Sequence, residues 1–295
     1  MTMRSRFYEL AAQALLDDVR VALVTAEIGV GELPEHPRHF NVGIREQLMI
    51  GVTAGLALEG LRPVAHTYTP FLVERPYEQL KLDLGHQDLG AVLVSTGASY
   101  DASSSGRTHQ APEDVAAMAA LPGWTIEVPG HADELERAFR RALVHDDRVY
   151  IRLSAEANAA AVEGDGLVVL RRGTDGAPVV VAVGPALEET LAATADLDAT
   201  VAYLSTARPF DRAGLRGALR GTDVVLVEPY LAGTSAAEVA RALVDRPHRL
   251  LALGVEIPEL RRYGTPAEHR AAQGLDAAGI RASLAAFGAR RLRAA

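Results

Sequence analysis

Short apolar runs alternate with longer segments of helical periodicity along the first half of the chain. The runs with the length and composition of buried strands are residues 21–25, 62–67, 91–96, 124–128 and 149–153. Helical periodicity fills the segments between them, at residues 44–59, 76–84, 112–120 and 132–144. Strands that alternate with helices are typical of parallel sheets. The pattern therefore predicts a mostly parallel sheet with helices on both faces.

The alternation stops between residues 155 and 175 and then starts again. Small, charged and glycine-rich segments, AEANAAAVEGDGL and RRGTDGAP, occupy the gap. Beyond it, strands are predicted at residues 179–183, 199–205, 223–228 and 250–255, and helices at 187–195, 211–219, 235–244 and 277–287. We expect two doubly wound α/β domains, residues 1–158 and a smaller one at 176–295, joined by a linker at 159–175.

Composition narrows the class of protein. The 295 residues are 48% hydrophobic and 23% charged, which is typical of a soluble globular protein and argues against disorder. The net charge is -8 and no basic run is present, so a nucleic-acid partner is not expected. The absence of cysteine excludes disulfides, thiolate metal sites and cysteine nucleophiles. Because the sequence shows neither a signal peptide nor a run of 18 apolar residues, we expect a cytoplasmic protein without a membrane partner.

The first segment with candidate chemistry is FNVGIREQ, residues 40–47, which leads directly into a predicted helix. Glu46 falls in the first turn of that helix, where the positive end of the helix dipole stabilises a carboxylate. Acidic residues are common at this position for purely structural reasons. Its position alone therefore favours a structural role for Glu46 at the start of the helix over a functional one.

Two further segments follow strand ends. SSSGRTHQAPED, residues 103–114, places His109 in a flexible loop between a strand and a helix, and ligand sites of open parallel sheets lie outside the carboxyl ends of strands. Tyr68 and Phe71 follow the strand at 62–67 and are able to stack on a planar ring, although core packing is the simpler explanation for either. Taken alone, His109 is best explained as a surface histidine.

Taken together and in order, these segments resemble one known family. GIREQ, then GLALEGLRPVAHTYTPFLVERPYEQ, then GRTHQAPEDVAAMAALPGWTIEVPGHADEL, and finally EPYLAGTSAAEVA and RRYGTPAEHRAAQGLDAAGI are similar to the C-terminal half of transketolase-like enzymes over nearly the whole chain. The resemblance implies a pyrimidine-binding domain followed by a transketolase C-terminal domain. The same superfamily contains deoxyxylulose-phosphate synthase and the β subunits of 2-oxoacid dehydrogenases.

The resemblance assigns roles to four residues. Glu46 matches the glutamate that hydrogen-bonds N1′ of the thiamin diphosphate aminopyrimidine and shares a proton with it. Phe71 best matches the aromatic residue that stacks on this ring. Tyr68 is the other choice, because one extra residue precedes Arg75 and blurs the alignment. His109 matches the histidine that faces the C2 substituent and helps in proton transfer or oxyanion stabilisation.

The departures from the family concern substrate binding. Ser105 stands where an aspartate usually contacts sugar hydroxyls, and Ala155 stands where members that use sugar phosphates carry an arginine. Arg4 lies about where another phosphate-binding arginine falls, with Arg6 as the competing alignment. Arg107 replaces the usual proline or glutamine and offers a guanidinium to a carboxylate or phosphate from another direction.

The diphosphate-binding domain of the family is missing. Its Gly-Asp-Gly motif and downstream asparagine hold Mg²⁺ and the diphosphate. Gly164-Asp165-Gly166 is a false match, because the only asparagines, Asn41 and Asn158, precede it. We therefore expect no metal ligands in this chain, Mg²⁺ ligands on a partner chain, and thiamin diphosphate shared between the two.

The leading hypothesis is the C-terminal subunit of a split transketolase-like transferase that moves a two-carbon ketol unit. It would pair with an N-terminal subunit as α2β2 and use a small-molecule ketose or 2-oxoacid donor. One alternative is a subunit like the β chain of a 2-oxoacid dehydrogenase, or another acyl-transferring enzyme, that delivers a two-carbon unit to a carrier-protein thiol. A non-catalytic regulatory partner is the third. Glu46, Phe71 and His109 argue against it, since a scaffold needs none of them.

Overall fold

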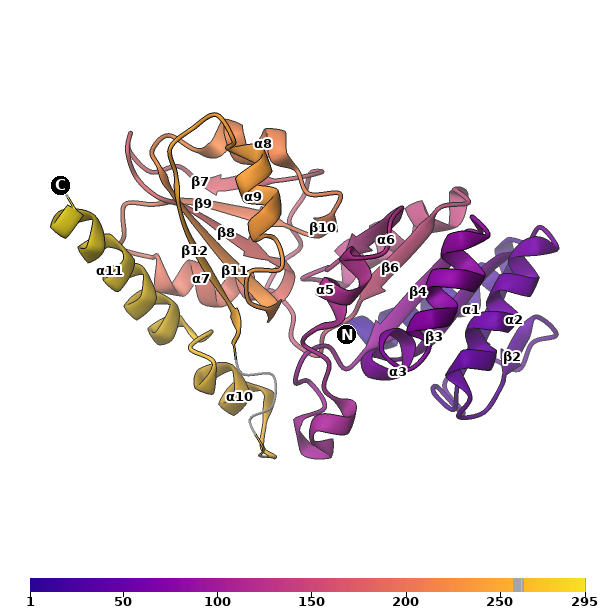
Figure 1. Cartoon of the computed structure of the whole chain (residues 1–295). Coiled ribbons are helices and arrows are strands. Elements are labelled where there is room, and N and C mark those ends of the chain that lie inside the picture. The colour runs from indigo at the N-terminus through magenta and orange to yellow at the C-terminus, as the bar shows by residue number, and fades with distance from the viewer. Residues whose placement is uncertain (257–260, 262, 295) are drawn as a thin grey trace.

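A computed structural model of the chain describes residues 1–256, 261 and 263–294, and within them it shows two sheets, one for each half (Figure 1). The seven-stranded sheet has the order β10-β5-β6-β4-β3-β1-β2, with β1 (Val21–Thr25), β2 (His39–Asn41), β3 (Arg62–Tyr68), β4 (Ala91–Thr96), β5 (Trp124–Glu127), β6 (Arg148–Arg152) and β10 (Thr206–Arg208). The five-stranded sheet has the order β12-β11-β8-β9-β7, with β7 (Val168–Arg171), β8 (Val179–Val183), β9 (Thr200–Leu204), β11 (Asp223–Leu231) and β12 (Arg249–Val255).

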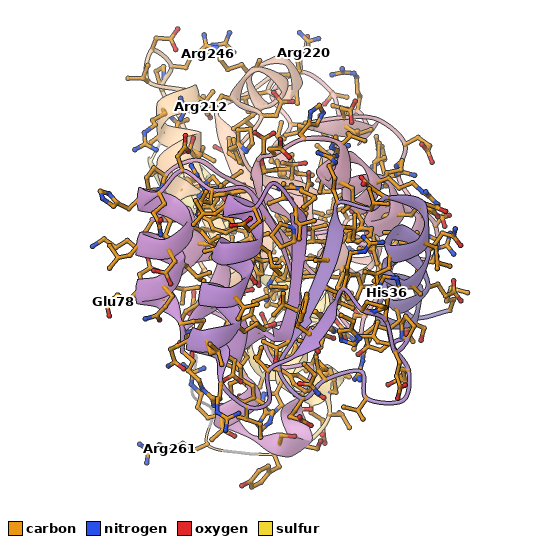
Figure 2. The ribbon with its side chains drawn as sticks, turned by 90° about the vertical axis from the view of Figure 1, so that its right-hand side faces the viewer. His36, Glu78, Arg212, Arg220, Arg246 and Arg261 are labelled. Carbon is orange, nitrogen blue, oxygen red and sulfur yellow. The ribbon has the colours of Figure 1, made fainter. Side chains whose placement is uncertain are left out.

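Helices cover both faces of the first sheet, which Figure 2 shows between them. Residues of β1 alternate between two cores: Leu23 packs in one hydrophobic cluster and Val24 in the other. The cluster with Leu23 includes Phe7 and Phe139, from α1 (Met3–Asp17) and α6 (Ala132–Val144). The other cluster draws on α2 (Glu46–Leu58), α3 (Thr69–Val73), α5 (Asp114–Ala119) and the π-helix η1 (Leu80–His86), which follows α4 (Tyr77–Gln79). Burial on both faces explains the continuous apolar runs of the strands.

The second sheet is built in the same way. Val181 of β8 packs in a cluster with α8 (Arg212–Ala218) and α9 (Ala236–Ala242), and Val180 faces the opposite cluster. That opposite face is covered by α7 (Leu187–Ala193) and α11 (Ala277–Ala294), with α10 (Pro266–Ala272) just before α11 in the chain (Figure 1). The predicted class, two α/β units with mostly parallel sheets, is confirmed.

Three short strands differ from the prediction. Strand β7 lies inside the segment expected as a linker and pairs antiparallel with β9, so regular structure resumes before residue 175. The three residues each of β2 and β10 were not expected to form strands at all. All three strands lie at sheet edges and are partly exposed, so they lack the buried apolar run that reveals a central strand.

Strand β10 joins the two halves, because it belongs in sequence to the second half and in space to the first sheet. It pairs antiparallel with β5, Thr206 opposite Glu127. The Val128 amide donates to the Ser205 carbonyl over 2.6 Å, and the Thr206 hydroxyl donates to Glu127 over 2.8 Å. The two halves of the chain are therefore connected by backbone hydrogen bonds as well as by the chain itself.

A buried ion pair ties α5 to β6 near this junction. Arg152 donates through Nε to Oδ2 of Asp114 over 2.7 Å, and the Tyr150 hydroxyl donates to the same oxygen over 2.6 Å. Both ionic side chains are at most 1% exposed. Arg152 also donates to the Ser99 hydroxyl, which in turn donates to the Pro229 carbonyl of β11. The pair therefore supports the junction as well as the first sheet.

We expect Arg152→Ala to lower the free energy of unfolding by about 3–5 kcal/mol, because it leaves the Asp114 carboxylate buried without its cation. Arg140→Ala is the matched control: Arg140 is 59% exposed and pairs with Glu136 on the same helix, and this change should cost about 0–1 kcal/mol. Urea denaturation followed by circular dichroism measures both. Equal losses in the two variants would contradict the assigned role of Arg152.

Candidate functional site

The carboxyl ends of β3 and β4, together with the start of α2, bring the predicted residues into one region. Tyr68 ends β3, and Phe71 lies in α3 immediately after it. Glu46 opens α2, and His109 ends the short helix η3 (Arg107–His109) in the segment that follows β4. Because the carboxyl ends of neighbouring parallel strands lie along one edge of a sheet, loops that are distant in sequence meet there.

Three rings form the centre of the region. The Phe71 ring centroid lies 5.0 Å from that of His109 and 6.3 Å from that of Tyr68, and the Tyr68 and His109 centroids are 5.7 Å apart. Each pair is tilted by 74–79°, so the rings meet edge to face. All three are partly exposed, which makes the cluster a surface that a ligand reaches.

Glu46 is a buried carboxylate with one cationic partner. The residue is 1% exposed, and its Oε2 accepts a hydrogen bond from Arg75 Nη1 over 2.7 Å. The Arg75 guanidinium also lies over the Phe71 ring, 4.1 Å from the centroid. A turn through Gly43, with φ at 73°, leads into α2, and the Gly43 amide donates to the Asn41 side chain over 3.0 Å. This turn places the carboxylate beside the aromatic cluster.

The loop that carries His109 bends at Gly106, with φ at 72°. His109 Nδ1 lies 2.9 Å from the Thr108 hydroxyl, which leaves Nε2 as the nitrogen for an external group. The Arg107 guanidinium donates to Glu113 over 2.5 Å and to the Gln110 carbonyl over 2.6 Å. Arg107 is therefore engaged within its own loop.

A cavity of about 360 Å³ opens beside Tyr68. The lining includes Arg4 and two of the positions that depart from the family, Ser105 and Ala155, whereas the third, Arg107, is not part of it. Arg4 donates to the Tyr8 hydroxyl over 2.8 Å and lies 3.4 Å from a Glu32 oxygen. Arg6, the competing alignment, pairs with Glu9 and Glu136. Arg4 lines the cavity and Arg6 does not.

Asp101 is a member of this cavity that sequence reasoning missed. Its carboxylate accepts hydrogen bonds from the Ala155 amide over 2.7 Å and from the Ser154 hydroxyl over 3.3 Å. Burial raises the pKa of Asp101 to about 7, and these two hydrogen bonds oppose the shift. The only signal in the sequence was an acidic residue five positions after a strand end, which is common in loops.

Two other features bear on cofactors and membranes. In the described part of the chain, no three His, Cys, Asp or Glu side chains come together as a metal site requires. Asp165 of the Gly-Asp-Gly match is 98% exposed, and its oxygen lies 3.8 Å from an Arg141 nitrogen. Among the described helices, none combines the length and apolarity needed to cross a membrane.

Sequence comparison places the chain among known proteins. The family model for the transketolase pyrimidine-binding domain matches residues 2–159. The chain is 47% identical to an uncharacterized 33.6 kDa protein in the fasciation locus of Rhodococcoides fascians, over 97% of this chain and 94% of that protein. It is 31% identical to the 6-deoxy-6-sulfo-D-fructose transketolase subunit SqwH of Clostridium sp. strain MSTE9, over 77% and 75%. It is 32% identical to 1-deoxy-D-xylulose-5-phosphate synthase of Leptothrix cholodnii, over 95% and 48%.

Solved structures share the fold. A split-gene transketolase, described as an inactive beta4 tetramer, superposes with a TM-score of 0.79 at 24% identity and covers 96% of both chains. Transketolase from Campylobacter jejuni superposes with a TM-score of 0.79 at 18% identity, over 97% of this chain and 46% of that one. The chain thus spans about half the length of the synthase and of the Campylobacter enzyme. It belongs to the transketolase family of thiamin diphosphate-dependent enzymes and carries the pyrimidine-binding domain of that family.

Proposed function

We propose that this chain is the pyrimidine-binding subunit of a split transketolase-like enzyme that transfers a two-carbon ketol unit. The observation that carries the proposal is the placement of a buried carboxylate, Glu46, beside the Phe71 ring and His109 at one edge of the sheet. A separate subunit would supply the diphosphate and Mg²⁺ ligands. The relatives named as subunits of transketolases support a two-chain enzyme.

The residues present fit the aminopyrimidine of thiamin diphosphate. The Arg75 guanidinium, a planar group with N–H donors, already lies on the Phe71 ring and donates to Glu46. The same pair of contacts suits a flat nitrogen heterocycle. Glu46 and Phe71 would hold the ring, with Tyr68 at its side. The cofactor supplies the carbon nucleophile that carries the two-carbon unit.

Glu46 would share a proton with N1′ of the ring through a hydrogen bond. The carboxyl group of Glu46 would hold a proton against this nitrogen, and would thereby support the acid–base chemistry that the bound cofactor supplies. The side chain is 2% exposed, so water does not compete for the shared proton. Burial of Glu46 therefore contributes to the chemistry as well as to the position of the carboxylate.

His109 would act on the substrate. Its Nδ1 lies beside the Thr108 hydroxyl, so Nε2 would face the substrate oxygen. When protonated, Nε2 would donate to that oxygen as negative charge develops there and would exchange a proton with it later. The neighbouring Tyr68 and Phe71 rings restrict the orientation of the imidazole and exclude water from part of its surface.

A partner subunit has a surface to bind next to Glu46. Two apolar side chains beside Glu46 are exposed: Ile44 at 70% and Leu48 at 50%. An apolar face rimmed by polar residues is typical of a protein interface. Its position next to the carboxylate supports an arrangement in which the cofactor lies between the two chains.

We expect the isolated chain to bind thiamin diphosphate no better than millimolar, because it offers one ring face and one carboxylate but no described cluster of metal ligands. The partner to test is a chain with a Gly-Asp-Gly motif and a downstream asparagine, encoded beside this one. Calorimetry should detect tight binding only for the mixture with Mg²⁺, and light scattering should report two copies of each chain. Micromolar binding by this chain alone would contradict the proposal.

The cavity predicts poor use of phosphorylated acceptors. It holds one cation, Arg4, and one acid, Asp101, while Ala155 and Ser105 supply neither charge. We expect the catalytic efficiency with ribose 5-phosphate to be lower, by a factor of about ten or more, than with the best unphosphorylated aldehyde or carrier thiol. This factor corresponds to the loss of one charged contact. A mass-spectrometric product screen with the reconstituted enzyme measures this ratio, and equal efficiencies would contradict it.

The pKa of Asp101 adds a pH dependence to this prediction. The carboxyl is largely neutral below about pH 7 and charged above it, so repulsion of the phosphate should grow as the pH rises through 7. Asp101→Asn should remove this dependence while preserving the shape of the side chain. If a carrier with a lipoyl disulfide proves the best acceptor, the disulfide takes up two electrons as the two-carbon unit becomes a thioester, and the transfer is an acyl transfer of the kind that the 2-oxoacid dehydrogenase alternative describes.

A further inference from the structure

Arg75 is positioned by its backbone, while its head group reaches solvent. The Arg75 amide donates to the Pro70 carbonyl over 3.1 Å, and the Arg75 carbonyl accepts from the Gln47 side chain over 3.2 Å. The side chain is 38% exposed, whereas that of Glu46 is 2% exposed. The guanidinium can therefore swing from Glu46 into water by side-chain rotation, with its backbone held in place.

The contacts of Arg75 match those proposed for the aminopyrimidine. Its guanidinium stacks on Phe71 at 4.1 Å and donates to Glu46 over 2.7 Å, and Tyr68 and His109 meet the same ring edge to face. Stacked layers are about 3.5–4.0 Å apart. No second planar group fits between a guanidinium at 4.1 Å and the ring, so the two ligands of Phe71 exclude each other.

We infer that Arg75 competes with the aminopyrimidine for Glu46 and Phe71, so that cofactor binding is an exchange in which the guanidinium leaves. The inference rests on the proposed function. It makes Arg75 a positioning residue, which keeps the Glu46 carboxylate turned toward the Phe71 ring. Arg75 also lowers the apparent affinity for the aminopyrimidine. Only the molecules in which Arg75 has left Glu46 and Phe71 can bind the ring, so the affinity falls as that fraction falls.

The test measures binding of thiamin, which carries the aminopyrimidine without the diphosphate, to the full-length chain by NMR titration. If Arg75 holds the contacts in about nine molecules of ten, Arg75→Ala should bind thiamin about tenfold more tightly than the unmodified chain. Arg75→Lys keeps a charge near Glu46 but has no flat group for Phe71, and should fall between the two. Arg45→Ala is the matched control: its guanidinium donates to the Val42 carbonyl, and affinity should change less than twofold.

Equal or weaker binding by Arg75→Ala would overturn the inference, because it would mean that Arg75 supports the site instead of competing for it. If Arg75→Ala does not fold, the comparison of Arg75→Lys with the unmodified chain decides in the same way. Glu46→Gln separates the two proposals. Binding that is indifferent to Glu46 contradicts the proposed function and the inference together. Binding that stays undetectable in Arg75→Ala contradicts the inference alone, because weak binding by the isolated chain is what the proposed function predicts. Binding that needs Glu46 but does not tighten in Arg75→Ala contradicts the inference alone.

Discussion

Replacement of Glu46 by glutamine is expected to reduce turnover of the reconstituted enzyme by about two to four orders of magnitude, the range for a general acid or base. An amide occupies the same space and still forms a hydrogen bond to a ring nitrogen, but it cannot hold a proton that the ring shares. Because Glu46 is 1% exposed, no water molecule is expected to take over this role. The loss should therefore appear in kcat.

Glu78→Gln is the matched control, since Glu78 projects from the surface (Figure 2) and the same chemical change should leave turnover unaltered. Circular dichroism and light scattering on Glu46→Gln should match the unmodified chain. If the variant loses activity because it no longer assembles with its partner, Glu46 is an interface residue and the catalytic assignment is wrong.

His109→Ala is expected to reduce kcat by about two to three orders of magnitude, the loss that follows removal of one donor to a developing oxyanion. The imidazole lies 5.0 Å from the Phe71 ring, close enough to the proposed cofactor position to reach a substituent on it. Thiamin binding should be unchanged in this variant, because His109 meets the edge of the cluster and the proposed ring contacts belong to Glu46 and Phe71.

Two further variants sharpen this test. His86→Ala removes an exposed histidine of η1 and should leave turnover unchanged. Thr108→Val removes the hydroxyl beside Nδ1, and the resulting loss should be smaller than that of His109→Ala, because the imidazole stays and loses only one hydrogen-bond partner. Equal turnover in His109→Ala and the unmodified enzyme would remove His109 from the mechanism.

The central strands of both sheets were predictable because burial on both faces leaves an unbroken apolar run. Strands β1, β4 and β8 begin and end at the predicted residues. Edge strands carry no such signal: β7 is partly exposed along its length and follows glycine-rich sequence. The helix predicted at 76–84 divides into α4 and the wider turns of η1, a difference in hydrogen bonding that apolar spacing does not encode.

Part of the candidate site was likewise predictable from the sequence, and part was not. Glu46, Phe71 and His109 were predicted because their sequence context resembles a known family, and the sheet brings them into one region. The contact between Arg75 and Glu46 and the place of Asp101 in the cavity were not predicted. Both depend on how loops fold back at the ends of strands. These contacts join residues that are far apart in the sequence, so the local pattern of hydrophobic residues does not predict them.

The position of β10 in the first sheet determines which fragments of this protein can fold on their own. A chain cut after residue 158 would keep every residue of the proposed cofactor site but would leave the outer side of β5 as an open edge, a template for pairing with another molecule. It would also remove Val183, Ala207 and Tyr230 from the hydrophobic cluster beneath α2 and α5. The smallest autonomous folding unit therefore extends past residue 208, and edge-to-edge association through β5 is the expected hazard of any fragment that lacks β10.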